Sequence, residues 1–263
     1  MSPRAPDPTP DAPASTPGPL LVELVGPAGI GKSAVARLVE RGDTDGERRL
    51  LAGDALERHD RLKGGQAVLA RKGWARSWAV WRAARCRPAF ADAVSALVTS
   101  LDADDGRRRR MAQRAMGHLR MLVDLARDGS TDGVLVDQGI TNMLWSITVG
   151  VDLKDDPRLR AVLDAYLDAV DVRFVLLRAD PAVVTERVFA REAVSRFSAR
   201  SDARTRAAFP RWLANQGAIE AMLPERRIIA RMETTDADAE TVAGRVRAQI
   251  EPWLSARSRR AAA

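Results

Sequence analysis

The chain has 263 residues, of which 46% are hydrophobic and 29% are charged, a composition typical of a folded globular protein. Its net charge of +7 favours phosphorylated or polyanionic partners without choosing among them. The single Cys86 excludes an intramolecular disulfide and a CxxC metal site, and with two histidines a His-rich metal centre is not expected.

Residues 1–19 contain seven prolines, which fix φ and remove backbone donors, so this segment is predicted to be a disordered tail. No apolar run reaches the roughly 18 residues of a membrane span, and the first residues lack the basic-then-apolar order of a secretory signal. We therefore expect a cytoplasmic protein that makes no membrane contact.

Short apolar runs alternate with segments of helical periodicity along the rest of the chain. Strands are expected at residues 20–25, 48–54, 132–137, 172–177 and 226–230. Helices are expected after the first strand, in several segments of 55–127, at 159–170, along 180–223 and from 242 onward. This alternation predicts an α/β fold over residues 20–256, with a parallel sheet, helices on both faces and a flexible C-terminus at 257–263.

The strongest motif is GPAGIGKS at residues 26–33, which fits the pattern GxxxxGK[ST] and lies between an expected strand and an expected helix. Its backbone N–H groups and the helix N-terminus would form an anion nest for a nucleotide's phosphates. Lys32 would reach the β- and γ-phosphates, and the Ser33 hydroxyl would bind Mg²⁺. The expected nucleotide-binding residues are Gly26, Pro27, Ala28, Gly29, Ile30, Gly31, Lys32, Ser33 and Ala34.

Asp137 ends the expected strand of VLVD, at residues 134–137. At that edge of the sheet a carboxylate can hold Mg²⁺ directly or through water, or accept a proton from an attacking hydroxyl. The alternative is an aspartate that only caps a helix or a turn.

Two segments, DGVLVDQGITNMLWS from residue 132 and VRFVLLRADPAVVTERVFARE from residue 172, resemble the thymidylate kinase and deoxynucleoside kinase group. The resemblance implies a P-loop NTPase fold of three layers, ATP and Mg²⁺ as cofactors, a helical acceptor-binding region at 54–129 and an arginine-rich lid at 187–222. In that lid Arg187 and Arg191 would stabilise the transferred phosphoryl group and Arg187 would also lie over the nucleotide. The chain departs from the family at Gln138, which stands where relatives carry an arginine near the acceptor.

Weaker expectations follow from the same resemblance. Asp54, after the second strand, corresponds to a carboxylate that serves as base or as an indirect magnesium partner. Thr234 and Asp236, after the last strand, could approach the adenine through backbone atoms. Trp145 is expected, from its own place in the segment after Asp137 and not from the resemblance, to line the acceptor pocket with Asp54 and Gln138. A simple turn or helix cap remains the alternative for Asp54, Thr234 and Asp236.

Arginine side chains on a closing segment can stabilise phosphoryl transfer while water is expelled. Residues 187–211 hold seven arginines and two acidic residues, although a solvated basic helix has the same composition. A run of four arginines at 107–110 has no interleaved aromatic residues, so we expect a solvated face there and no nucleic-acid partner. Trp74, Trp78 and Trp81 recur at helical spacing, which favours a packed hydrophobic face over a stacking wall.

The sequence therefore predicts an ATP- and Mg²⁺-dependent kinase of a small acceptor, with a nucleoside or nucleotide as the expected class. The catalytic residues would be Lys32, Asp54, Asp137, Arg187 and Arg191. The alternative is a P-loop ATPase or nucleotide-dependent switch whose output is an interaction with a macromolecule, nucleic acid included. A homodimer is left open.

Overall fold

The computed structural model describes residues 19–41, 50–53, 85, 87–127, 132–148, 156–190 and 203–262. Within these residues five strands form one sheet in the order β2-β3-β1-β4-β5, and every neighbouring pair is parallel. The strands are β1 (Leu20–Val25), β2 (Leu50–Gly53), β3 (Gly133–Val136), β4 (Val172–Arg178) and β5 (Ile228–Glu233).

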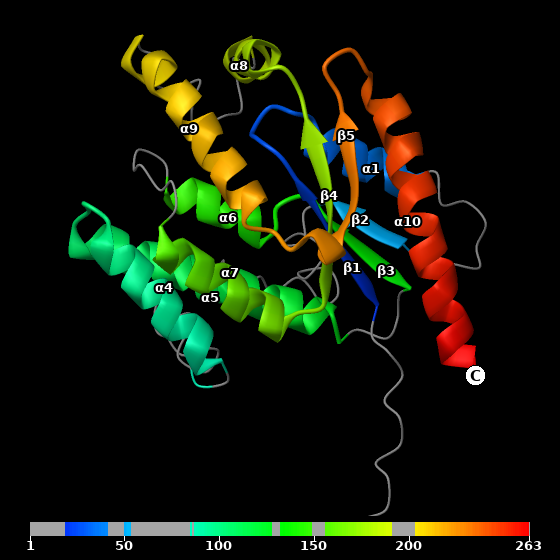
Figure 1. Cartoon of the computed structure of the whole chain (residues 1–263), viewed down its shortest axis with the longest axis horizontal. Coiled ribbons are helices and arrows are strands. Elements are labelled where there is room, and N and C mark those ends of the chain that lie inside the picture. Colours follow the sequence, from blue (N-terminus) through cyan, green and yellow to red (C-terminus); the bar gives the residue numbers. More distant parts are fainter. Residues whose placement is uncertain are drawn as a thin grey trace, which may run out of the picture.

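Helices connect the strands and cover both faces of the sheet (Figure 1). The described helices are α1 (Lys32–Arg41), α4 (Pro88–Ser100), α5 (Asp105–Leu125), α6 (Ile140–Ile147), α7 (Pro157–Ala169), α8 (Pro181–Ala190), α9 (Ala203–Ala221) and α10 (Ala239–Ala262), with a 3₁₀ turn η2 (Glu225–Arg227) before β5. The expected α/β class, with a parallel sheet between two helical layers, is confirmed.

Helices cover both faces of the sheet, and successive side chains of a strand point to opposite faces, so both sets of side chains are buried. Leu21 and Val25 of β1 pack in the core formed with α4 to α9, whereas Val22 and Leu24 pack in the core formed with α1 and α10. Short, nearly continuous apolar strands are typical of such doubly covered parallel sheets. This is why the strand runs could be recognised in the sequence.

The connections after β1 and β3 leave the sheet on opposite faces. The chain passes from β1 into α1 on one face and from the neighbouring β3 into α6 on the other. Parallel sheets bind ligands in the crevice where neighbouring connections diverge in this way. The loop at residues 26–31, here called the glycine loop, and the turn at residues 137–139, here called the Asp137 turn, meet at this crevice.

The last strand begins later than the sequence predicts. Residues 225–227 form the turn η2, and β5 pairs with β4 from Ile228 to Glu233 instead of occupying 226–230. The outward charged side chain of Arg231 hides the strand pattern in this segment. The helix α10 likewise continues to Ala262, into the segment predicted to be a flexible C-terminus. Of the tail expected at 1–19, residues 1–18 lie outside the described residues.

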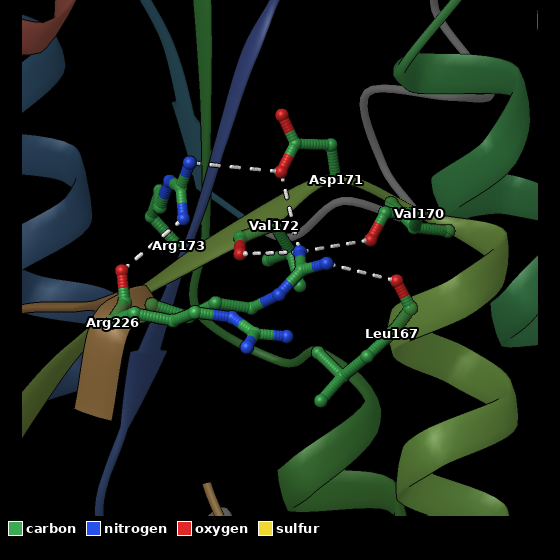
Figure 2. Close-up of polar contacts among 7 residues, drawn as sticks. Leu167, Val170, Asp171, Val172, Arg173 and Arg226 are labelled. Carbon is green, nitrogen blue, oxygen red and sulfur yellow. Dashed lines mark hydrogen bonds and ion pairs between the residues drawn. The ribbon is translucent and has the colours of Figure 1, made fainter. Parts of the chain in front are cut away.

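Arg227, in η2, joins three elements at the edge of the sheet opposite the crevice. Its guanidinium donates to the carbonyl oxygens of Leu167 at 3.1 Å, Val170 at 3.5 Å and Val172 at 3.3 Å, and to Asp171 at 3.2 Å. Figure 2 shows these acceptors gathered where α7 ends and β4 begins. The last carbonyls of a helix have no partner within it, so Arg227 satisfies the end of α7 and attaches it to β5.

Candidate functional site

The glycine loop turns sharply between β1 and α1. Gly26, Gly29 and Gly31 have φ of 152°, 85° and 100°, a region that favours glycine because side chains rarely adopt it. A Cβ at Gly29 would also overlap the side chain of Val188 on α8. The loop therefore needs its glycines both for its backbone conformation and for its close packing against α8.

Lys32 is the first residue of α1 and is only 8% exposed. Its ammonium donates to the carbonyl oxygens of Gly26 at 2.5 Å and Pro27 at 2.9 Å, so the side chain folds back over the loop. Ser33, the next residue, is exposed. The first N–H groups of α1 have no acceptor within the helix, and together with the loop they provide the donors that an anion requires.

Burial lowers the pKa of Lys32 from 10.5 to about 8, while the negative charges of Asp137, Glu23 and Glu220 act in the opposite direction. The ammonium is therefore poorly hydrated and within electrostatic reach of three carboxylates of the described part of the chain. A bound anion such as phosphate would compensate for this lost hydration, because it favours the charged form of a lysine.

Asp137 ends β3 beside β1, since Val136 pairs with Glu23 in the parallel ladder. It is 1% exposed, whereas the neighbouring Gln138 is exposed. The expected position of Asp137 at the end of a strand beside the glycine loop is therefore observed. Its charge acts on Lys32 more strongly than the charges of Glu23 and Glu220 do.

Glu23 is a residue of this site that the sequence reasoning missed. It lies inside the apolar strand β1 and is 1% exposed. Its carboxylate accepts hydrogen bonds from the backbone N–H of Thr141 at 2.9 Å and from the Thr141 hydroxyl. Burial raises the pKa of Glu23 to about 7 against the opposing effect of these hydrogen bonds. The available signal was a carboxylate within a run too apolar to leave it in water.

A cavity of about 720 Å³ opens beside the glycine loop, and we call it the α8–α9 cavity. Pro27, the end of β4, the start of α8, the second half of α9 and the residues after β5 form its wall. Two of its polar groups come from α9: Glu220, which lies 3.6 Å from Arg178, and the buried Gln216. Burial raises the pKa of Glu220, and the Gln216 amide donates to it at 3.4 Å.

Of the residues expected to bind adenine, Asp236 lines the α8–α9 cavity, whereas Thr234 is buried at the end of the sheet. Arg187 of α8 reaches the segment after β5 and donates to the Thr235 carbonyl at 3.0 Å. Thr234 is 2% exposed, and both its N–H and its hydroxyl donate to the Arg178 carbonyl, at 2.7 and 3.0 Å. Thr234 therefore closes the end of the sheet, and its neighbours Thr235 and Asp236 line the cavity in its place.

Trp145, expected in the acceptor pocket, packs in the core of the protein. The side chain is 2% exposed, and its ring N–H donates to the Trp212 carbonyl of α9 at 2.6 Å. Trp145 lies on the buried side of α6, a short helix in which six of eight residues are buried. In this structure it joins α6 to α9 and lines no described pocket wall.

The part of the expected lid that α9 forms is anchored to the body of the protein. Phe209 and Ile219 are fully buried, and Asn215 donates to the Thr148 carbonyl at the end of α6, at 3.2 Å. The remaining predicted site residues, Asp54 and Arg191, lie outside the described residues, as do the three tryptophans at 74, 78 and 81.

No cluster of three or more metal-binding side chains occurs within the described residues, and no helix among them is long and apolar enough to cross a membrane. No protein-family model matches the chain, and no curated protein is significantly similar to it. Its function is therefore inferred from its own residues and their geometry.

Proposed function

We propose that the chain is a P-loop phosphotransferase that moves the γ-phosphoryl group of a nucleoside triphosphate, with ATP as the expected donor, to a small acceptor of the nucleoside or nucleotide class. One observation carries this proposal. Lys32, buried at the end of the glycine loop, lies within the electrostatic reach of Asp137 from the neighbouring strand. A cation and a carboxylate set against a nest of N–H groups suit a phosphate and its magnesium ion.

Different residues of the site would bind the phosphates and the magnesium ion. The amides of the glycine loop and Lys32 would hold the β- and γ-phosphates, for which Lys32 must exchange its bonds to Gly26 and Pro27. Ser33 and Asp137 would hold Mg²⁺, which when bound neutralises charge on the phosphates. Mg²⁺ usually takes one or two protein oxygens and fills its shell with phosphate and water, which is the number of oxygens that Ser33 and Asp137 would supply.

The α8–α9 cavity suits the nucleoside part of the donor. Its volume lies in the range of small-ligand sites, and its wall is largely apolar, with Leu177, Val184 and Leu213 among its residues. Four carboxylates also line it, from Asp180, Glu220, Glu233 and Asp236. They would repel phosphates but accept hydrogen bonds from base N–H groups and ribose hydroxyls, so the phosphates belong at the glycine loop and the nucleoside in the cavity.

The acceptor would enter on the side of Asp137 and the exposed Gln138. We propose that Asp137 orients the attacking oxygen or its magnesium ion, that Gln138 contacts the acceptor, and that Arg187, on the helix leading into the proposed lid, neutralises charge near the donor. Asp54 and Arg191 keep their proposed roles as base and lid cation. An amide in place of an arginine at position 138 favours an acceptor bound by hydrogen bonds over one bound by charge.

The test is phosphoryl transfer from labelled ATP in the presence of Mg²⁺ to a panel of nucleosides, nucleotides and other hydroxylated metabolites. With a productive acceptor, Lys32→Ala is expected to lower kcat at least about 100-fold, the effect of losing one preorganised donor to a transition-state charge. Arg37→Ala is the matched control, because it removes a positive charge from an exposed position of the same helix.

Equal transfer by the Lys32→Ala variant and the wild-type protein would overturn the proposal. Hydrolysis of ATP at one rate, whatever acceptor is added, would instead establish the alternative of an ATPase or switch. The melting temperature of each variant shows whether a loss of transfer reflects the site or the fold.

A further inference from the structure

Glu23 is a carboxylate buried in the apolar core of the protein. It lies between Leu21 and Val25 on the face of β1 that packs against α4 to α9, and both of those neighbours are fully buried. An isolated buried carboxylate costs several kcal/mol unless other groups compensate for its lost hydration. A leucine or valine would fill this position without that cost.

Residues 140 and 141, at the start of α6, donate hydrogen bonds that offset the burial of the Glu23 carboxylate. The carboxylate accepts from the N–H and the hydroxyl of Thr141, 118 residues away in the chain, and it also interacts with the N–H of Ile140. These residues form the first turn of α6, whose N–H groups have no acceptor within the helix. Glu23 thus acts as a cap supplied by β1 to a helix that follows β3.

The carboxylate of Glu23 also packs closely against the backbone at Gly139. A Cβ on Gly139 would overlap the carbon and both oxygens of the Glu23 carboxylate. Gly139 adopts an extended conformation, with φ of −87°, so the glycine is required by the approach of Glu23 and not by its own backbone angles. On the other side, Tyr166 of α7 is buried near the carboxylate, and burial together with Glu23 raises the pKa of its hydroxyl well above the usual value.

The two segments that Glu23 connects are the two halves of the proposed site. β1 continues from Glu23 through two residues into the glycine loop, and the Asp137 turn lies directly before the residues that Glu23 binds. We propose that Glu23 is a positioning residue, whose carboxylate holds the Asp137 turn against β1 so that Asp137 and Gln138 face the phosphates held at Lys32. This inference rests on the proposed function of the site.

The test compares Glu23→Gln, which keeps the shape of the side chain and removes its charge, with Thr141→Val, which removes only the hydroxyl. Both variants are expected to lower kcat about tenfold or more and to raise the Mg²⁺ concentration for half-maximal activity by a similar factor. Changes of this size are typical when a group that orients a metal ligand is lost. The KM for ATP should change little, because the glycine loop and the cavity are untouched. Thr141→Ser, which restores the hydroxyl, is expected to recover most of the loss.

Thr148→Val provides a matched control, since it removes a buried hydroxyl at the other end of α6, which donates to the carbonyl oxygens of Leu144 and Trp145 in the same helix. If Glu23 has a purely structural role, Glu23→Gln and Thr141→Val will lower the melting temperature and leave the Mg²⁺ dependence unchanged, as Thr148→Val does. That result would overturn the inference. So would full activity of Glu23→Gln. Absence of Mg²⁺-dependent ATP binding by the wild-type protein would refute the proposed function itself, so the two failures are distinguishable.

Discussion

Lys32 and Glu23 are ionisable side chains buried on the two sides of the proposed phosphate site, and burial shifts their pKa values in opposite directions. The pKa of Lys32 falls to about 8, and that of Glu23 rises to about 7. Each shift means that the folded protein disfavours the charged form, by about 1.4 kcal/mol for each tenfold change in acidity. Both side chains are therefore retained at a cost in stability, which is typical of residues kept for binding or catalysis.

The stability of the protein should depend on pH through Glu23. The unfolded chain releases this proton near the ordinary value of 4.5, whereas the folded protein keeps it up to about pH 7. Between these values the folded state binds the extra proton, so its free energy of unfolding decreases as the pH rises. We expect urea unfolding to show that the wild-type protein loses about 2 kcal/mol between pH 5 and 8 relative to Glu23→Gln, since a pKa raised to about 7 has this consequence.

Comparison of the two proteins isolates Glu23, because other carboxylates titrate alike in both. Of the described groups that act on Glu23, Lys32 has a pKa of about 8, at the upper limit of this range, and burial raises the pKa of Tyr166 well above it, so the difference is clearest between pH 5 and 7. Identical pH profiles for the two proteins would show that Glu23 ionises in the folded state as it does in water.

At the scale of elements, two charged side chains connect the sheet to helix ends. Glu23, in the central strand β1, caps the start of α6. Arg227, in the turn before the edge strand β5, satisfies the last carbonyls of α7 (Figure 2). In both cases a charged group supplies the partner that a helix end lacks.

Replacing Arg227 should destabilise the protein far from the site. Arg227→Met keeps much of the side-chain length and removes the guanidinium that donates to four acceptors. We expect a loss of about 2 kcal/mol in the free energy of unfolding, because hydrogen bonds to a charged group have this scale. Arg226→Met is the control, because Arg226 is exposed and contributes its carbonyl to Arg173, at 3.3 Å. We expect a change below about 0.5 kcal/mol for it, and equal effects in the two variants would contradict the role of Arg227.

At the scale of the whole molecule, the sequence predicts the features that depend on residues close together in the chain, such as strands and the turns that follow them. The five strands follow from apolar runs, and the structure agrees with them except at the bounds of β5. Asp137 directly follows β3 as expected, whereas phosphate binding by the glycine loop stays a prediction. Glu23 and the α8–α9 cavity could not be found in this way, because each depends on contacts between residues far apart in the chain. The burial of Trp145 depends in the same way on α9, which packs over α6.

Binding of the donor should stabilise the entire fold, since a ligand bound only by the folded state shifts the unfolding equilibrium. Mg²⁺ and ATP at about 100 times their dissociation constant are expected to add about 2.7 kcal/mol. For a chain of this size that raises the melting temperature by roughly 5 to 11 °C, measurable by calorimetry. Glu220→Gln tests the cavity: it keeps the side-chain shape and should reduce this shift, while an unchanged shift would place the nucleoside elsewhere.

The contact between Glu23 and Gly139 also constrains how the protein can evolve. Neither position can change freely, because a side chain at 139 would overlap the carboxylate of residue 23. A lineage that replaced Glu23 with a small apolar residue would gain room at 139 and lose the cap on α6 at the same step. The order of substitutions therefore matters: glycine is expected to disappear only after glutamate does, and the pair should be inherited together.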